Sequence, residues 1–359
     1  MESKTATPPD EPVLSGVHGH YEIQRPLGRG GMGAVYLARQ VDLGRLVVVK
    51  VIAASNEGHK VAVERFRREA KATARIDSDN VVKVYETGRL EGIPFIALEF
   101  VDGCSAADLL AQGRLAPPTA TAIVHAVARA LERTHAAGIV HRDVKPSNVL
   151  VCRDGRVKLA DFGLAKLAPG EGVEDQVTVT APGTTPGTPA YMAPEQAQAF
   201  ELDGRADVYA LGVSLFELLT GELPFLAETT FETLSLRVSN DAPSPRLHAP
   251  DLPEEYEKIC ASLLAREPHD RATIEKAIAL LEPLLPANPT AAIAGLFPEN
   301  APVAPPTVSS SPLAPVRAVR RRSLPRTVAL LVCAAALLAL AALVARERHA
   351  PGRQEVRSR

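Results

Sequence analysis

Three short segments of this chain contain residue types that could bind phosphate, hold a metal ion or move a proton. The first is "LGRGGMGAV", residues 27–35, with glycines at positions 28, 30 and 33. A glycine has no β-carbon to keep a ligand away, so backbone amides in such a segment can approach phosphate oxygens. Alone the signal is weak, because a glycine-rich hairpin is more often a simple turn. No helix is expected directly after it, which favours a flap over phosphates rather than a dinucleotide-binding turn.

The second segment is an apolar run, "LVVVK", which ends in a lysine seventeen residues after Gly33. Lys50 could be an ordinary solvated lysine at a strand edge. The unbroken run at residues 47–49 predicts a strand buried on both faces, however, and a lysine there needs an anionic partner. Glu69, in a segment with helical spacing, could supply the carboxylate. A lysine held in this way makes a fixed positive contact for a nucleotide phosphate.

The third segment, "HRDVKPSNVL" at residues 141–150, contains Asp143, Lys145 and Asn148. Thirteen residues after Asn148 comes Asp161, in "DFG", again after an apolar run typical of a strand. An amide and a carboxylate brought together at neighbouring strand ends form an oxygen-rich site of the kind that Mg²⁺ prefers. The alternative is structural, since Asx turns in such a loop can satisfy backbone groups.

The surrounding sequence predicts the elements that must position these residues. Between residues 21 and 100, short β-branched runs separated by Gly and Asp turns predict a small antiparallel sheet, interrupted by the one helix with Glu69. After residue 103 the apolar period becomes helical. Residues 117–138 open with prolines and end at a glycine, and residues 207–221 are apolar almost all round, which indicates a buried helix. The expected fold class is α+β.

In order and spacing, these segments resemble the protein kinases, specifically the eukaryotic-like Ser/Thr kinases of bacteria. The resemblance covers about residues 21–281 and includes "GTPAYMAPE" at residues 187–195, "DVYALG" with Asp207 and "DRAT" with Arg271. It implies a bilobal protein-kinase fold, with a small β-rich N-lobe containing one helix and a larger α-helical C-lobe. It also implies a buried ion pair between Glu195 and Arg271, and Asp207 as a brace for the catalytic loop.

The resemblance implies a nucleotide site formed by the N-lobe and the connector to the C-lobe. Lys50, paired with Glu69, would hold the α- and β-phosphates of ATP. The other residues implied to bind ATP are Leu27, Gly28, Gly30, Gly33, Val35, Glu99 and Val101, the last two through their backbone groups. Val48 stands where the family usually has alanine against the adenine ring, and its two extra methyl groups could narrow the pocket.

The resemblance also assigns the chemistry. Asp143 would accept the proton of the substrate hydroxyl, and Lys145 would stabilise charge on the transferring phosphoryl group. Asn148 and Asp161 would bind Mg²⁺, or Mn²⁺ in its place. Thr188 would tie the substrate-facing loop to the catalytic loop, and "HRDVKP" with "GTPAY" is the Ser/Thr pattern rather than the Tyr pattern.

Regulation can be inferred from an arginine and a threonine-rich segment. Arg142 could pair with a phosphate on the activation segment and order it through charge-assisted hydrogen bonds. "VTVTAPGTTPGT" offers Thr178 and Thr180 as the expected sites, because the family tends to have a Thr-x-Thr pair there. The alternative is a flexible loop whose hydroxyls are merely solvated. We favour autophosphorylation that orders the segment. Two copies of the chain could phosphorylate each other, so a homodimer is a possible partner arrangement.

Composition predicts the remaining organisation: a disordered arm at 1–20, a kinase domain at 21–282 (N-lobe about 21–100, C-lobe about 101–282), a Pro-rich and Arg-rich linker at 283–327, a transmembrane helix at 328–345 and a short tail at 346–359. The apolar segment has eighteen residues and no charge. At 1.5 Å per residue it spans about 27 Å, within the usual range for one membrane crossing.

The expected location is therefore the cell membrane, single-pass, with membrane lipids as a partner. Arginines flank both ends of the span, so the positive-inside rule hardly indicates which end faces the cytoplasm. ATP and Mg²⁺ are cytosolic, which indicates a cytoplasmic kinase domain. No apolar signal peptide is evident at the N-terminus, and the tail is too short to fold into an external sensor.

The sequence predicts a Ser/Thr protein kinase that transfers the ATP γ-phosphate to protein hydroxyls. A net charge of −2 argues against nucleic acid as a partner, and the four scattered cysteines argue against a disulfide framework or a zinc site. The alternative is a pseudokinase or a nucleotide-binding docking module. The presence of Lys50, Asp143 and Asp161 favours the enzyme.

Overall fold

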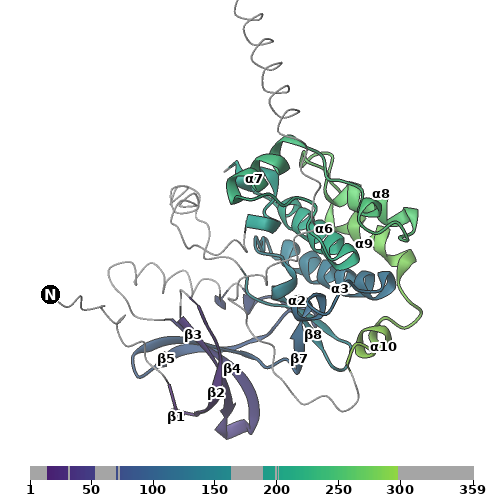
Figure 1. Ribbon diagram of the computed structural model, residues 1–359. Helices are drawn as coiled ribbons and strands as arrows, with labels where there is room; N and C mark the ends of the chain where they lie inside the picture. The colour runs from purple at the N-terminus through teal and green to yellow at the C-terminus, as the bar shows by residue number, and fades with distance from the viewer. Residues whose placement is uncertain are drawn as a thin grey trace, which may run out of the picture. The chain divides into compact units, whose positions relative to one another are not determined.

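The computed structural model describes residues 14–30, 33–52, 70–71, 73–162, 189–198, 200 and 202–297. Within these ranges the chain forms a β-rich N-lobe followed by a helical C-lobe (Figure 1). Several predictions concern residues outside them: residues 1–13 of the disordered arm predicted at 1–20, Glu69 and most of its helix, Thr178, Thr180, Thr188 and the apolar segment 328–345. The remaining part of that predicted arm is ordered in the structure, because Gly16–His18 form a strand that pairs with residues 21–23 and Leu14 is buried in the sheet's core. Among the residues that are described, no helix is both long enough and apolar enough to cross a membrane.

The N-lobe is a six-stranded antiparallel sheet with the strand order β1-β2-β3-β4-β6-β5. Its strands are β1 (Gly16–His18), β2 (Tyr21–Gly30), β3 (Gly33–Gln40), β4 (Arg45–Ile52), β5 (Val84–Leu90) and β6 (Ile93–Glu99). A short 3₁₀ turn (Val41–Leu43) joins β3 to β4, and Gly44 after it adopts a left-handed conformation with φ +64°. Each strand pairs with a sequence neighbour, except that β4 pairs with β6 and not with β5, and the small antiparallel sheet predicted from the β-branched runs is confirmed.

Strand β4 differs from the prediction of a strand buried equally on both faces. Val47 and Val49 are fully buried in the sheet's apolar core, whereas Val48 and Lys50 are only half-buried on the opposite face. Alternate residues of a strand point to opposite faces, so one face packs on the core and the other remains available to a ligand. Val48 and Lys50 therefore share a face, and Val48 pairs with Leu98 of β6.

The C-lobe is built around two long helices that pack against each other (Figure 1). Its helices are α2 (Ala106–Leu110), α3 (Pro117–Ala136), α5 (Pro194–Ala197), α6 (Arg205–Thr220), α7 (Thr230–Ser239), α8 (Glu254–Leu263), α9 (Ile274–Leu281) and α10 (Pro289–Ala294), with a small sheet of β7 (Gly103–Ser105), β8 (Val149–Cys152) and β9 (Val157–Leu159).

Both long helices were predicted, and the structure confirms their ends and their burial. Helix α3 begins with prolines in its first turn and is followed by Gly138 at φ +72°. Residues 206–219 of α6 are all buried, and Gly221 ends the helix at φ +80°. A helix that is apolar on every side is stable only inside a large domain, which is where α6 lies.

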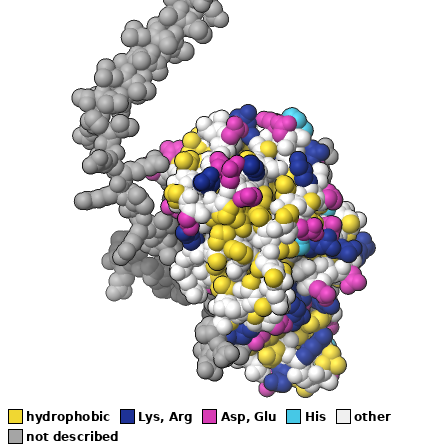
Figure 2. All heavy atoms as spheres, turned by 90° about the vertical axis from the view of Figure 1, so that its right-hand side faces the viewer, with side chains coloured by type: hydrophobic (Ala, Val, Ile, Leu, Met, Phe, Trp, Pro, Cys, Tyr) yellow, Lys and Arg dark blue, Asp and Glu magenta, His cyan; other side chains and the backbone are white. Residues whose placement is uncertain are grey.

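The folded part of the C-lobe extends beyond the predicted boundary at residue 282. A 3₁₀ turn (Glu282–Leu284) leads into α10, where Ile293 is 3% exposed and belongs to the main core. Phe297 lies under the guanidinium of Arg153, 5.5 Å from it. The prolines after residue 282 predicted a linker, but the few apolar residues between them suffice to pack this segment against the C-lobe core. Figure 2 shows the side on which Figure 1 draws α8, α9 and α10, with hydrophobic side chains gathered among charged ones.

Candidate active site

The loop between α3 and β8 brings three predicted catalytic residues into direct contact. Lys145 Nζ donates to Asp143 Oδ2 over 2.8 Å. Asn148 Nδ2 donates to the same oxygen over 3.1 Å and to the backbone oxygen of Asp143 over 2.8 Å. The Asp143 and Lys145 side chains are 15% and 19% exposed, so the carboxylate is accessible yet held by two donors. This arrangement orients a base toward an incoming hydroxyl.

Asp207, at the start of α6, holds the loop between α3 and β8 in place through its carboxylate. Its side chain is completely buried, and its two oxygens accept from the amides of His141 and Arg142 over 2.8 and 2.7 Å. His135 Nε2 lies 2.8 Å from the same carboxylate. Arg142 has φ +66°, a conformation that costs a non-glycine residue free energy and persists only when its surroundings enforce it. The predicted bracing role of Asp207 is confirmed.

Asp161 follows β9 and lies close to the catalytic loop. The amide of Ala160 donates to the backbone oxygen of Asn148 over 2.9 Å, so the two residues predicted to bind Mg²⁺ stand on adjoining backbone. The Asn148 amide nitrogen already donates to Asp143, which leaves its oxygen as the atom that a cation would use. One carboxylate and one amide oxygen suit Mg²⁺, which usually takes few protein ligands and completes its shell with phosphates and water.

Lys50 links this site to the N-lobe. Its Nζ donates to Asp161 Oδ1 over 2.7 Å, and both side chains are about one-third exposed. The positive charge of Lys50 is the main reason that the pKa of Asp161 lies below its usual value, so the carboxylate is ionised at neutral pH. The predicted partner of Lys50, Glu69, lies outside the described residues. Lys50 pairs with Val35 of β3, so the glycine-rich hairpin lies next to it.

The glycine-rich segment forms the predicted hairpin. Gly28 pairs with Val35 and Gly30 with Gly33 across β2 and β3. Gly33 has φ +144°, which only glycine adopts readily, and β2 is irregular between Pro26 and Gly28. The hairpin thus presents backbone rather than bulky side chains near Lys50. Leu27, just before this irregularity, is half-buried.

Glu99, in the connector to the C-lobe, binds a buried lysine that sequence reasoning missed. Lys158 in β9 is 2% exposed, and its Nζ donates to Glu99 Oε2 and to the Asp79 backbone oxygen, each over 3.0 Å. The Glu99 amide also donates to the backbone oxygen of Lys83 over 2.9 Å. Val101, two residues further, is 3% exposed. A lysine inside the apolar run "VKLA" is the signal that could have identified this contact, by the argument applied to Lys50.

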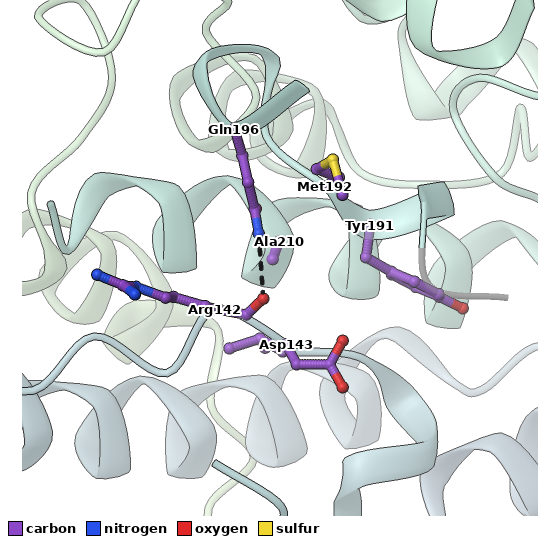
Figure 3. A pocket seen from close by; sticks show the side chains of 7 residues that line it. Arg142, Asp143, Tyr191, Met192, Gln196 and Ala210 are labelled. Atoms are coloured by element: carbon purple, nitrogen blue, oxygen red, sulfur yellow. Dashed lines mark hydrogen bonds between the residues drawn. The ribbon is translucent and has the colours of Figure 1, made fainter. Parts of the chain in front are cut away.

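A short 3₁₀ turn, Pro189–Tyr191, lies opposite the catalytic loop, and the two line a common pocket. The pocket is lined by Arg142, Asp143, Val144, Tyr191, Met192, Gln196 and Ala210 (Figure 3). Figure 3 shows Gln196 reaching the backbone oxygen of Arg142, a bond of 3.3 Å, while the Arg142 side chain points away from the Asp143 carboxylate. A polypeptide that offers a hydroxyl to Asp143 would therefore meet Tyr191 and Met192.

The predicted ion pair beneath this region is also present. Arg271 Nη1 and Nη2 donate to the two carboxylate oxygens of Glu195 over 2.6 and 2.9 Å, and both residues are buried. The two parallel bonds match the fork of the guanidinium to the carboxylate. Sequence reasoning missed two further buried contacts to the Pro189–Tyr191 turn: a bond from the Tyr191 hydroxyl to Glu217, and a set of bonds from Arg237.

Comparison with known proteins agrees with this geometry. The protein kinase domain family matches residues 21–280. A probable serine/threonine-protein kinase of Streptomyces coelicolor is 38% identical over 258 residues, which cover 70% of this chain and 38% of that protein. Serine/threonine-protein kinase PknL of Mycobacterium tuberculosis is 35% identical over 272 residues, covering 76% of this chain and 66% of PknL. This chain thus spans less than two thirds of the length of these relatives.

Solved structures lead to the same assignment. The crystal structure of the kinase domain of Mycobacterium tuberculosis PknI superposes with a TM-score of 0.57 at 29% sequence identity, covering 76% of this chain and 99% of that one. The predicted bilobal fold is confirmed, with its sheet in the N-lobe and its helices in the C-lobe. With the family match over most of its length and the residues predicted to be catalytic in contact, this chain belongs to the protein kinase family.

Proposed function

We propose that this protein is a Ser/Thr protein kinase that transfers the γ-phosphate of ATP to Ser or Thr hydroxyls of other proteins. One observation supports this above the others: Asp143, Lys145 and Asn148 form a single hydrogen-bonded group beside the Lys50–Asp161 pair. Its relatives in Streptomyces and Mycobacterium are named as serine/threonine-protein kinases. Phosphoryl transfer depends mainly on positioned charge, which this group supplies.

In this proposal each residue has a defined task. The Asp143 carboxylate takes the proton of the substrate hydroxyl as the hydroxyl oxygen bonds to the γ-phosphorus and the bond to the leaving ADP oxygen breaks. Lys145, 2.8 Å from that carboxylate, places positive charge beside the transferring group. Asn148 and Asp161 would hold Mg²⁺, which supplies charge neutralisation to the phosphates when bound. Lys50 would leave its bond to Asp161 and contact phosphate oxygens of ATP instead.

We further propose activation by autophosphorylation. Arg142 Nε is buried and has no hydrogen-bond partner among the described residues, and burial lowers the pKa of its guanidinium. A phosphate would provide the missing acceptor and pair with the charge. Thr178 and Thr180 are the proposed sites. Phosphopeptide mass spectrometry of an active preparation tests this idea, and finding both threonines unmodified would remove it.

The proposed location is the cell membrane, with residues 328–345 as the span and the kinase domain in the cytoplasm. Support comes from the uncharged, eighteen-residue apolar run and from the cytosolic supply of ATP. Extraction of membranes with alkaline carbonate tests it. Recovery of the full-length protein in the extract would argue against a span, whereas a variant lacking 328–345 should be extracted fully.

The decisive test of catalysis is transfer of labelled γ-phosphate to the protein itself and to a generic protein substrate. Asp143→Asn removes the base and should lower transfer by a factor of about 10² or more. Asp154→Asn, at an exposed carboxylate whose partner among the described residues is Arg156 over 2.8 Å, is the matched control and should keep full activity. Equal labelling by wild type and Asp143→Asn would refute the assignment, and ATP binding without any transfer would favour the docking-module alternative.

A further inference from the structure

Arg237 on α7 is a charged residue with no exposed surface and an unusual set of partners. Its Nη1 donates to the backbone oxygens of Pro189 and Met192 over 2.7 and 2.8 Å, and its Nη2 donates to that of Ala190 over 2.6 Å. All three acceptors belong to one stretch of four residues, 48 to 45 positions away along the chain. One guanidinium therefore binds most of the backbone oxygens of the turn that faces Asp143.

The chemistry of this contact favours a specific structural task. A buried guanidinium loses much hydration free energy unless several good acceptors replace water. Three neutral backbone oxygens satisfy Nη1 and Nη2 only if the turn keeps one conformation, while the buried Nε has no hydrogen-bond partner among the described residues. The rings of Phe225 and Tyr209, 5.9 and 6.0 Å from the guanidinium carbon, hold the cation in place from the sides. A lysine could not reproduce this planar two-pronged geometry.

The turn held by Arg237 forms part of the pocket that contains Asp143. Tyr191 and Met192 line that pocket together with Asp143. A second buried contact holds the same turn, since the Tyr191 hydroxyl donates to Glu217 Oε2 over 2.6 Å. Residues of α6 and α7 thus hold the turn through buried hydrogen bonds, and its position sets the space that a substrate chain can occupy in front of Asp143.

We propose that Arg237 is a positioning residue for the protein substrate: by binding the backbone oxygens of residues 189, 190 and 192 it preforms the surface on which the acceptor polypeptide docks. This inference rests on the proposed kinase function. If the turn were not preformed, each substrate would have to order it on binding, which weakens binding without altering the phosphate-transfer groups. None of the residues assigned to ATP contacts Arg237 in the described part of the chain.

The test compares Arg237→Lys with wild type in steady-state kinetics and in amide hydrogen exchange. Because a lysine cannot match the planar geometry of these three bonds, the substitution should raise the KM for a protein substrate at least about tenfold. The KM for ATP and kcat should change by less than about twofold, because the transferring groups are untouched. The amide of Met192, which donates to the Pro189 oxygen over 3.3 Å, should exchange faster in the variant.

Tyr256→Phe is the control for a general loss of stability. It removes another buried bond of the C-lobe, 2.8 Å between the Tyr256 and Thr121 hydroxyls, at a place distant in sequence from the turn. It should lower the melting temperature without changing the KM for protein. If Arg237→Lys does not fold, Arg237→Gln serves instead, because its amide keeps two donors and requires no buried charge.

The outcomes separate the two proposals. Absence of transfer by wild type would remove the proposed function, while hydrogen exchange would still report whether Arg237 orders the turn. Normal transfer by wild type, with an unchanged KM for protein in the Arg237 variant, would overturn the inference. A rise in the KM for ATP as large as that for protein would also overturn it, since that pattern indicates general disruption.

Discussion

Glu217 should make the stability of this protein depend on pH in a way that a single substitution removes. Its carboxyl is 5% exposed within α6 and accepts a bond of 2.6 Å from the Tyr191 hydroxyl. Burial raises the pKa of Glu217 from 4.5 to about 7, although the bond from Tyr191 acts in the opposite direction. The group is thus protonated in the folded state over a pH range where the unfolded chain has released the proton.

The sign and size of the effect follow from this difference. Because the folded state binds the proton more tightly, the free energy of unfolding is largest below pH 4.5 and falls as the pH rises toward about 7. A difference of about 2.5 pKa units, at 1.36 kcal/mol per unit, corresponds to about 3 kcal/mol in total. Between pH 5 and pH 8 the expected loss is about 2.5 kcal/mol, since part of the transition lies below pH 5.

Glu217→Gln tests this expectation because glutamine can accept the Tyr191 bond but cannot ionise. Urea denaturation at pH 5 and pH 8 should show wild type losing about 2.5 kcal/mol more than the variant over that interval. Glu255→Gln, at an exposed carboxylate on α8, is the matched control and should follow wild type. If wild type and Glu217→Gln changed in parallel with pH, a buried, protonated Glu217 would be refuted.

Two further predictions concern buried contacts of the C-lobe. Arg271→Leu leaves the Glu195 carboxylate buried without its partner and should cost about 3–5 kcal/mol in urea denaturation, while Arg266→Leu at a surface pair should cost less than about 1 kcal/mol. Gly155→Ala should detach α10, because a β-carbon there meets a backbone oxygen of that helix, and limited proteolysis should then cut the chain near residue 289. Gly44→Ala shares the left-handed backbone but has open space around it, so it should leave proteolysis unchanged.

Much of the catalytic group could be predicted because its signals are local. Asp143, Lys145 and Asn148 lie within six residues, and their contacts arise within one loop. Helices α3 and α6 were also predictable, since prolines, a closing glycine and apolar periodicity act over a few turns of chain. The prediction for β4 was right in type but wrong about its second face, because a run of valines does not reveal which face meets a ligand.

The sequence by itself determined the fold class and the order of the motifs, because these depend on residue type and short spacing, and through those motifs it showed the resemblance that implies which residues could transfer phosphate. Only the tertiary structure decided that Lys50 contacts Asp161, that α10 docks on the C-lobe, and that Arg237 binds the turn at residues 189–192. The partners in these contacts lie tens of residues apart. A charged residue within an apolar run indicates that it needs a partner when buried, but the packing of the helices and strands decides which residue that partner is.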